Sequence, residues 1–94
     1  MKVYLIEGNT DDEFGYEKQW EVALYSDKEQ AELHLNKLNE YAAQTHEDMN
    51  YERRNNISKN NPYDKRMKCY EGGTFYVLRE ITLFHHLDQF LEQT

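Results

Sequence analysis

The chain has 94 residues and a mass of 11.4 kDa, which suffices for one compact domain but leaves no room for a second hydrophobic core. Its 18 acidic and 11 basic side chains give a net charge of -7, which argues against a free-standing nucleic-acid-binding domain, because such domains usually carry an excess of Lys and Arg. Aromatic residues make up 14% of the chain and supply burial that a disordered acidic chain would lack. No apolar run approaches the roughly 20 residues of a membrane span, and the N-terminus lacks a signal-peptide pattern, so we expect a soluble, cytoplasmic protein.

Two segments near the N-terminus have strand-like patterns. Residues 2–8 are β-favouring or apolar on both faces and end at the turn-forming pair Gly8-Asn9. After an acidic stretch, residues 18–25 alternate, with Trp20, Val22 and Leu24 on one face. We expect an antiparallel hairpin with a long loop.

A helix start follows directly. Ser26 and Glu29 have the spacing of a capping box, in which each side chain bonds the other residue's backbone amide. The stripe that follows has helical spacing, with His34, Tyr41 and Thr45 beside it, and consists of Ala31, Leu35, Leu38 and Ala42. The pattern predicts one amphipathic helix that packs on a sheet and ends near residue 54.

The second half of the chain predicts a loop, a strand and a short helix. Periodicity is lost after residue 46, and we expect a long loop at residues 55–68. Alternation resumes after Gly72-Gly73, which predicts a third strand up to residue 82. Residues 84–92 place Leu87, Phe90 and Leu91 at helical spacing, which predicts a C-terminal helix.

The order strand, strand, helix, strand limits the topology of this single α+β domain, residues 1–94. The second and third strands are joined by a crossover and must run the same way, so the third strand fits beside the first, in order 2-1-3. The long helix then covers one face. If Trp20 points at that helix, the other face is too apolar to lie in water, and either the C-terminal helix or a second copy in a homodimer must cover it. The residues predicted for this contact are Tyr4, Ile6, Tyr76, Leu78, Leu87, Phe90 and Leu91.

Three stretches of the sequence resemble a group of small proteins of bacteria and their phages. They are KVYLIEG at the first strand, WEVALYSDKEQAELHLNKLNEY at the second strand and helix, and YVLREITL at the third strand; Asn-Pro-Tyr-Asp at residues 61–64 is a further shared feature. The resemblance covers most of the chain apart from the tail. It implies the same fold and a phage or mobile-element origin, and it transfers no catalytic residue.

The motifs of common metal and enzyme sites are missing from the sequence. The acidic stretch around Asp11 fails the spacing of a calcium loop, with Phe14 where the Gly belongs. His85 and His86 are adjacent, so their rings would diverge on a helix. Because Cys69 is the single cysteine, no internal disulfide can form. We therefore expect no metal, no cofactor and no enzymatic activity.

Charge is unevenly distributed along the chain. Residues 1–40 carry 4 basic and 10 acidic groups, net -6. An array of carboxylates on a strand, loop and helix can compete with phosphates for a basic groove in another protein, although acidity can equally serve solubility. The acidic residues in question are Glu7, Asp11, Asp12, Glu13, Glu17, Glu21, Glu29 and Glu32.

The middle of the chain has a net positive charge, in contrast to the N-terminal part. Residues 41–70 carry 6 basic and 4 acidic groups, net +2, and tyrosines interleave with the basic residues. Such a composition can contact phosphates and stack on bases, although an ordinary solvated loop explains it too. The candidate contacts are Arg53, Arg54, Lys59, Lys65, Arg66 and Lys68.

The sequence therefore predicts a non-catalytic module that binds another protein. In its narrower form this is a phage or mobile-element inhibitor whose acidic surface blocks a basic nuclease or another nucleic-acid-binding host protein. The first alternative is a nucleic-acid-binding accessory protein that uses residues 53–68, and the second is a small hydrolase.

Overall fold

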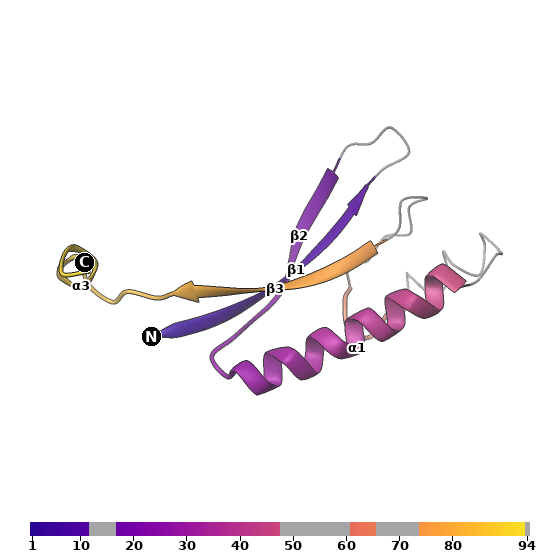
Figure 1. Ribbon diagram of the computed structural model, residues 1–94, viewed down its shortest axis with the longest axis horizontal. Helices are drawn as coiled ribbons and strands as arrows, with labels where there is room; N and C mark the ends of the chain where they lie inside the picture. Colours follow the sequence, from indigo (N-terminus) through magenta and orange to yellow (C-terminus); the bar gives the residue numbers. More distant parts are fainter. Residues whose placement is uncertain (12–16, 48–60, 66–73, 94) are drawn as a thin grey trace.

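The computed structural model describes residues 1–11, 17–47, 61–65 and 74–93 (Figure 1). These residues form a three-stranded antiparallel sheet in the order β2-β1-β3, with the long helix on one side. The α+β fold and the strand order 2-1-3 that the sequence predicts are thus confirmed. The elements are β1 (Lys2–Asp11), β2 (Glu17–Tyr25), α1 (Lys28–Glu47), β3 (Thr74–Thr82) and α3 (Leu87–Leu91).

A bulge in β2 decides which side chains face α1. Gly8 pairs with Trp20, but the register shifts between Ile6 and Glu7, so that Ile6 pairs with Ala23. One extra residue on β2 reverses the alternation beyond it. Trp20 and Tyr25 therefore both pack against the core beneath α1, although five positions separate them.

The observed register corrects the expected assignment of sheet faces. Gly8 pairs with both Trp20 and Tyr76, so Tyr76, together with Ile6 two residues along β1, lies on the same face as Trp20. Ile6 and Tyr76 are buried in the core and Leu78 packs against them, so these residues face α1, not the open side. Leu24, expected beneath the helix, is instead 61% exposed. Strict alternation along residues 18–25 put Leu24 on the same face as Trp20, and the bulge breaks that alternation.

Helix α1 begins one residue later than the capping-box prediction. The carboxylate of Asp27 accepts hydrogen bonds from the backbone amides of Glu29 (2.9 Å) and Gln30 (3.4 Å), and the Asp27 carbonyl accepts from the amide of Ala31. Asp27 is therefore the N-cap, in place of Ser26. An ionised carboxylate also suits the partial positive charge at this helix end.

The predicted stripe of α1 does form the helix side of the core. Ala31, Leu38 and Ala42 are buried, and Leu35 packs against the cluster that contains Ile6. The helix is described up to Glu47, so the prediction that it continues to about residue 54 lies outside the described residues, as does most of the loop predicted at 55–68.

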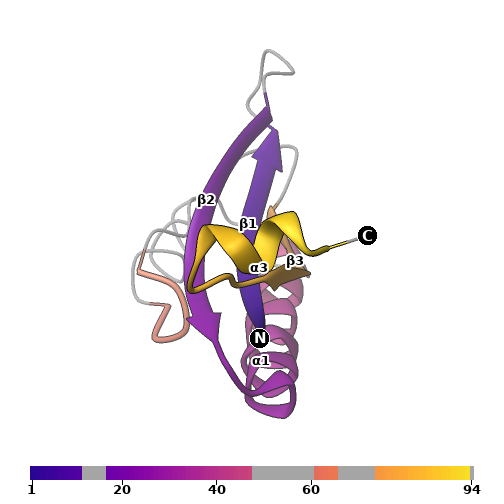
Figure 2. The ribbon, with the colours of Figure 1, turned by 90° about the vertical axis from the view of Figure 1, so that its left-hand side faces the viewer.

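The C-terminal segment leaves the sheet. Beyond β3, Met1 and Leu83 exchange backbone hydrogen bonds, and the chain then enters α3, which is shorter than the 84–92 helix that the sequence predicts. Within the described part of the chain, α3 contacts none of the other helices or strands. It lies at one end of the molecule and runs across the direction of the strands (Figures 1 and 2).

Neither described helix combines the length and apolar character needed to cross a membrane.

Candidate functional site

A buried carboxylate joins the sheet to the segment that crosses beside it. Asp64 is 3% exposed, and its Oδ2 accepts a hydrogen bond from Trp20 Nε1 at 2.8 Å and from the Tyr76 hydroxyl at 2.7 Å. The two donors come from β2 and β3, the outer strands of the sheet. A single oxygen therefore bridges both edges of the sheet through charge-assisted bonds, which are stronger than bonds between neutral groups.

A glycine on the central strand makes this arrangement possible. Gly8 pairs with Trp20 on one side and with Tyr76 on the other, so the three residues form a row across the sheet. The two rings meet edge to face over Gly8, with centroids 6.3 Å apart. A Cβ atom at position 8 would overlap the indole ring of Trp20, so the absence of a side chain there is a steric requirement.

The phenol in this row is held in its protonated form. Burial raises the pKa of Tyr76 well above its ordinary range, and the hydrogen bond to Asp64 and that carboxylate's charge raise it further. A phenol that cannot ionise near neutral pH acts here as a fixed hydrogen-bond donor. The chemistry of the Asp64 cluster is therefore suited to holding the fold together.

The rest of the 61–65 segment is fixed to α1 and β2. The side-chain oxygen of Asn61 accepts a hydrogen bond from the backbone amide of Tyr63 at 2.9 Å, and this bond closes an Asx turn. The Tyr63 carbonyl lies 2.8 Å from His34 Nε2, and Tyr25 Oη lies 2.8 Å from His34 Nδ1. Because a carbonyl can only accept, Nε2 is the donor, and in the neutral ring Nδ1 accepts from Tyr25.

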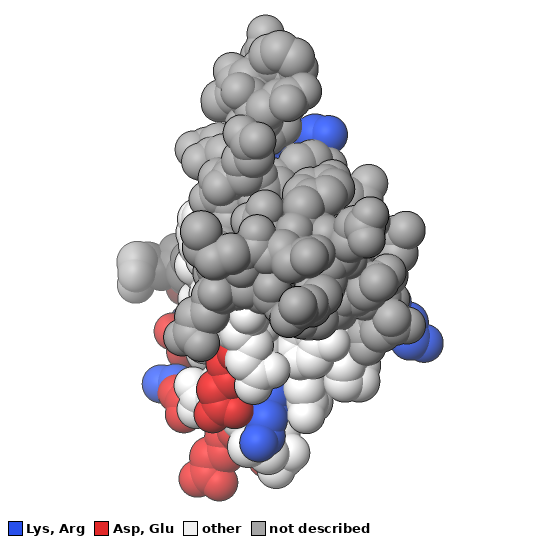
Figure 3. Space-filling model, turned by 90° about the vertical axis from the view of Figure 1, so that its right-hand side faces the viewer, with Lys and Arg blue, Asp and Glu red and all other residues white. Residues whose placement is uncertain are grey.

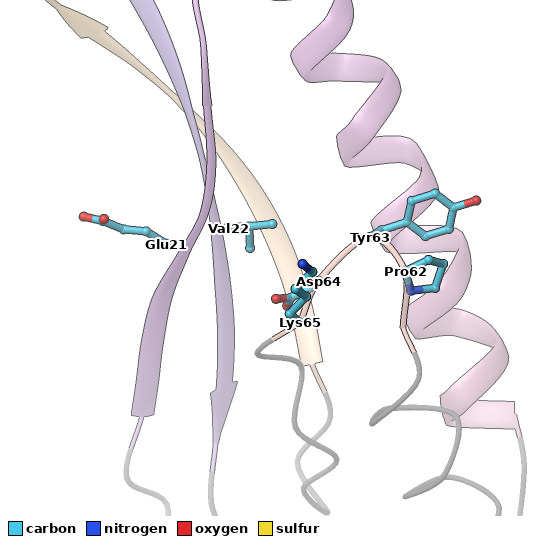
Figure 4. A pocket seen from close by; sticks show the side chains of 6 residues that line it. All are labelled: Glu21, Val22, Pro62, Tyr63, Asp64 and Lys65. Carbon is cyan, nitrogen blue, oxygen red and sulfur yellow. The ribbon is translucent and has the colours of Figure 1, made fainter.

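A small pocket lies beside this segment. It holds about 280 Å³, and Figure 4 shows Val22 pointing toward the 61–65 segment while Glu21 points away from it. The pocket is open to solvent, and its lining combines two acidic residues, one basic residue and three others. Its lining residues are Glu21, Val22, Pro62, Tyr63, Asp64 and Lys65.

The open face of the sheet is a second candidate site. Phe75 is 54% exposed, and Val77 and Ile81 on the same strand are also exposed. Leu24 on β2 lies on this side too, and at its centre Glu7 forms an ion pair with Arg79 at 3.4 Å. Large exposed apolar patches on small proteins mark interaction sites. We call Leu24, Phe75, Val77 and Ile81, with the Glu7–Arg79 pair, the open face.

The C-terminal tail, residues 83–93, carries a second apolar surface. Leu87 and Leu91 are 71% and 66% exposed and lie on one side of α3 together with Phe90. The ring of Phe84 packs edge to face on Phe90 at 5.4 Å, and the His85 amide donates to the Gln89 side chain. His86 occupies the N-cap position without a side-chain cap bond. The tail is thus ordered by its own contacts.

The acidic residues proposed from the sequence are divided between the two sides of the sheet. Glu7 and Glu21 are cross-strand partners on the side away from α1, whereas Glu29 and Glu32 lie exposed on α1. In the view of Figure 3, acidic and basic side chains lie next to one another beneath the grey atoms. The side chains of Asp11, Asp12, Glu13 and Glu17 lie outside the described residues.

Most of the basic candidates also lie outside the described residues: Arg53, Arg54, Lys59, Arg66 and Lys68. Lys65 is described and exposed, at the rim of the pocket. Cys69 is likewise not described. Within the ranges that are described, no cluster of three or more His, Cys, Asp or Glu side chains could hold a metal ion.

Sequence reasoning missed the role of Asp64, which it treated only as an acid within a basic loop. The Asn-Pro-Tyr-Asp stretch contains the Asx-turn residue and the proline that shape the segment. Neither signal reveals that the carboxylate meets Trp20 and Tyr76, which are 44 and 12 residues away along the chain.

Comparison of the chain with protein-family models, with curated proteins and with solved structures found no match.

Proposed function

We propose that this protein is a non-catalytic module that binds another protein, and that the open face of the sheet and the tail form its binding surface. The observation that carries this proposal is the exposure of Phe75, Val77 and Ile81 along one strand. Burying apolar surface contributes about 25 cal/mol of stabilising free energy for each Å² removed from water, and the exposed strip does not gain this contribution. A partner that covers the strip recovers this free energy.

The polar cluster supports the non-catalytic part of the proposal. Asp64 is engaged by Trp20 and Tyr76, and the raised pKa of Tyr76 keeps its hydroxyl proton in place. A general base or nucleophile needs a pKa matched to its task and access to a substrate. Asp64 is buried and Tyr76 stays protonated, which suits both side chains to packing.

The exposed carboxylates of α1 favour a narrower form, in which the protein inhibits a nucleic-acid-binding host protein. Glu29 and Glu32 lie one turn apart on the outer side of the helix. Fixed charges of this kind steer basic partners and compete with phosphates. The test is whether the protein displaces DNA from a basic nuclease, and whether Glu29→Lys with Glu32→Lys removes that competition.

Site-specific photo-crosslinking tests the main proposal. A benzoylphenylalanine in place of Val77 on the open face is expected to form a crosslink to one defined polypeptide in cells that produce the protein. The same group in place of Gln44, which is exposed on α1 about three turns beyond Glu32, is the matched control and should give no such product. If Val77 and Gln44 behave alike, the open face is not a binding surface.

A further inference from the structure

We propose that the partner on the open face is a second copy of this chain, with α3 of each copy packed on the sheet of the other. This inference rests on the proposed function and names its partner. Two apolar surfaces of one chain are exposed in the described structure: the open face, and the side of α3 that carries Leu87, Leu91 and the part of Phe90 that Phe84 leaves uncovered.

The geometry favours exchange of the tail between copies. α3 lies beyond the end of the sheet and crosses the strand direction, so it does not cover its own open face (Figures 1 and 2). Its apolar side has the i, i+3, i+4 spacing with which amphipathic helices pack on a surface. In two copies related by a two-fold axis, the tail of each copy can therefore pack on the open face of the other.

The exposed area is large enough for a dimer. An aromatic side chain offers about 150–250 Å² when fully exposed and an aliphatic one somewhat less, so the exposed apolar residues of the open face, Leu83 and α3 amount to several hundred Å² per copy, up to about 800 Å². A standard interface buries about 800 Å² on each partner. The residues counted are Leu24, Phe75, Val77, Ile81, Leu83, Leu87, Phe90 and Leu91.

The charges also allow this pairing. Each copy carries a net charge of -7, so two copies repel one another wherever acidic surfaces meet. On the open face, Arg79 lies against Glu7 at 3.4 Å and offsets its charge. Glu21, the cross-strand partner of Glu7, adds a further acidic group on this side, so contact through it buries apolar side chains but also brings some like charges together. Added salt should then strengthen the dimer by screening the remaining repulsion.

Sedimentation velocity on the full chain tests the proposal. From about 1 to 200 µM, the mass is expected to rise from 11.4 kDa toward twice that value. Leu87→Glu with Leu91→Glu should raise the dissociation constant at least tenfold. Leu33→Glu is the matched control, because Leu33 is an exposed leucine on α1, and it should leave the constant unchanged. A monomer at every concentration, or a dimer that tolerates both tail substitutions, overturns the proposal.

A crosslinker at Phe90 shows what the tail touches. In a mixture of isotopically labelled and unlabelled chains, the expected product joins Phe90 of one copy to a peptide of β3 in the other. Crosslinks from Val77 and Phe90 to a different protein, with none between copies, would refute the dimer and leave the proposed function standing. If neither position crosslinks to any protein, both proposals fail.

Discussion

The two faces of the sheet differ in a way that hydrophobicity alone does not predict. The face beneath α1 contains an indole N–H, a phenol and, beside them, a carboxylate, whereas the open face is dominated by Leu24, Phe75, Val77 and Ile81. The polar groups tolerate burial because each bonds to another, and a satisfied polar network rigidifies a core. The apolar face stays open because nothing in the described chain covers it. The comparison indicates that the covered face stabilises the fold, and the open face is the surface that we propose for association.

The largest expected effect comes from removing the carboxylate of the covered face. Asp64→Ala would leave the Trp20 and Tyr76 donors unsatisfied, and we expect a loss of about 4 kcal/mol in the free energy of unfolding, measured by urea denaturation. Asp64→Asn keeps an acceptor oxygen and should cost only about 1–2 kcal/mol. Lys65→Ala, at the exposed neighbour, is the control and should change stability by about 0.5 kcal/mol or less. A loss of only about 0.5 kcal/mol for Asp64→Ala would mean that the hydrogen bonds from Trp20 and Tyr76 to Asp64 do not stabilise the fold.

Filling the space above the central strand should have the next largest effect. Gly8→Ala places a methyl group against the indole of Trp20, and we expect a loss of about 2 kcal/mol from overpacking. In a Trp20→Val background, the same change should cost less than about 0.5 kcal/mol, because the overlapping ring is gone. Equal costs in both backgrounds would show that the ring contact is not the cause.

The buried phenol should leave a signature at alkaline pH. The pKa of Tyr76 is raised in the folded state, so the folded chain keeps a proton that the unfolded chain releases above about pH 10. The contribution of the protonated Tyr76 to the free energy of unfolding is fully present below that pH and is lost as the pH rises further. Tyr76→Phe should lower stability by about 1.5 kcal/mol at pH 7 and make the decline above pH 10 shallower. An unchanged alkaline slope in Tyr76→Phe would contradict this assignment.

Substitution on the open face should have the smallest effect on the isolated chain. Phe75→Ser is expected to change the free energy of unfolding by about 0.5 kcal/mol or less in dilute solution, where the chain is monomeric. With the proposed dimer, the loss should grow at high protein concentration, because association would stabilise only the folded wild-type chain. A loss above about 2 kcal/mol in dilute solution would mean that Phe75 is already covered within one chain.

The order of the elements could be read from the sequence, because strands and helices carry their own periodicity. The faces of the sheet could not, for two reasons. The pairing of Gly8 with Trp20 and Tyr76 does not follow from periodicity, and a single extra residue near Val22, which no turn residue marks, reverses the alternation towards Leu24. The N-cap is Asp27 and not the predicted Ser26 for a similar reason. Both residue types are good N-caps, and the sequence does not say which of them accepts the free backbone amides. Asp64 escaped notice because its partners are distant in the chain.

The anchoring of Asn61–Lys65 has a consequence for how the chain can vary. Residues 48–73 connect α1 to β3, and the bonds of Asp64 hold the middle of that connection against the sheet. For loop-closure entropy, the anchor at residues 61–65 divides this connection into two shorter ones, and lengthening either one adds little cost. Insertions should therefore be tolerated on both sides of the anchor, whereas a change of one residue between Asn61 and Asp64 would shift the carboxylate out of reach of its two donors.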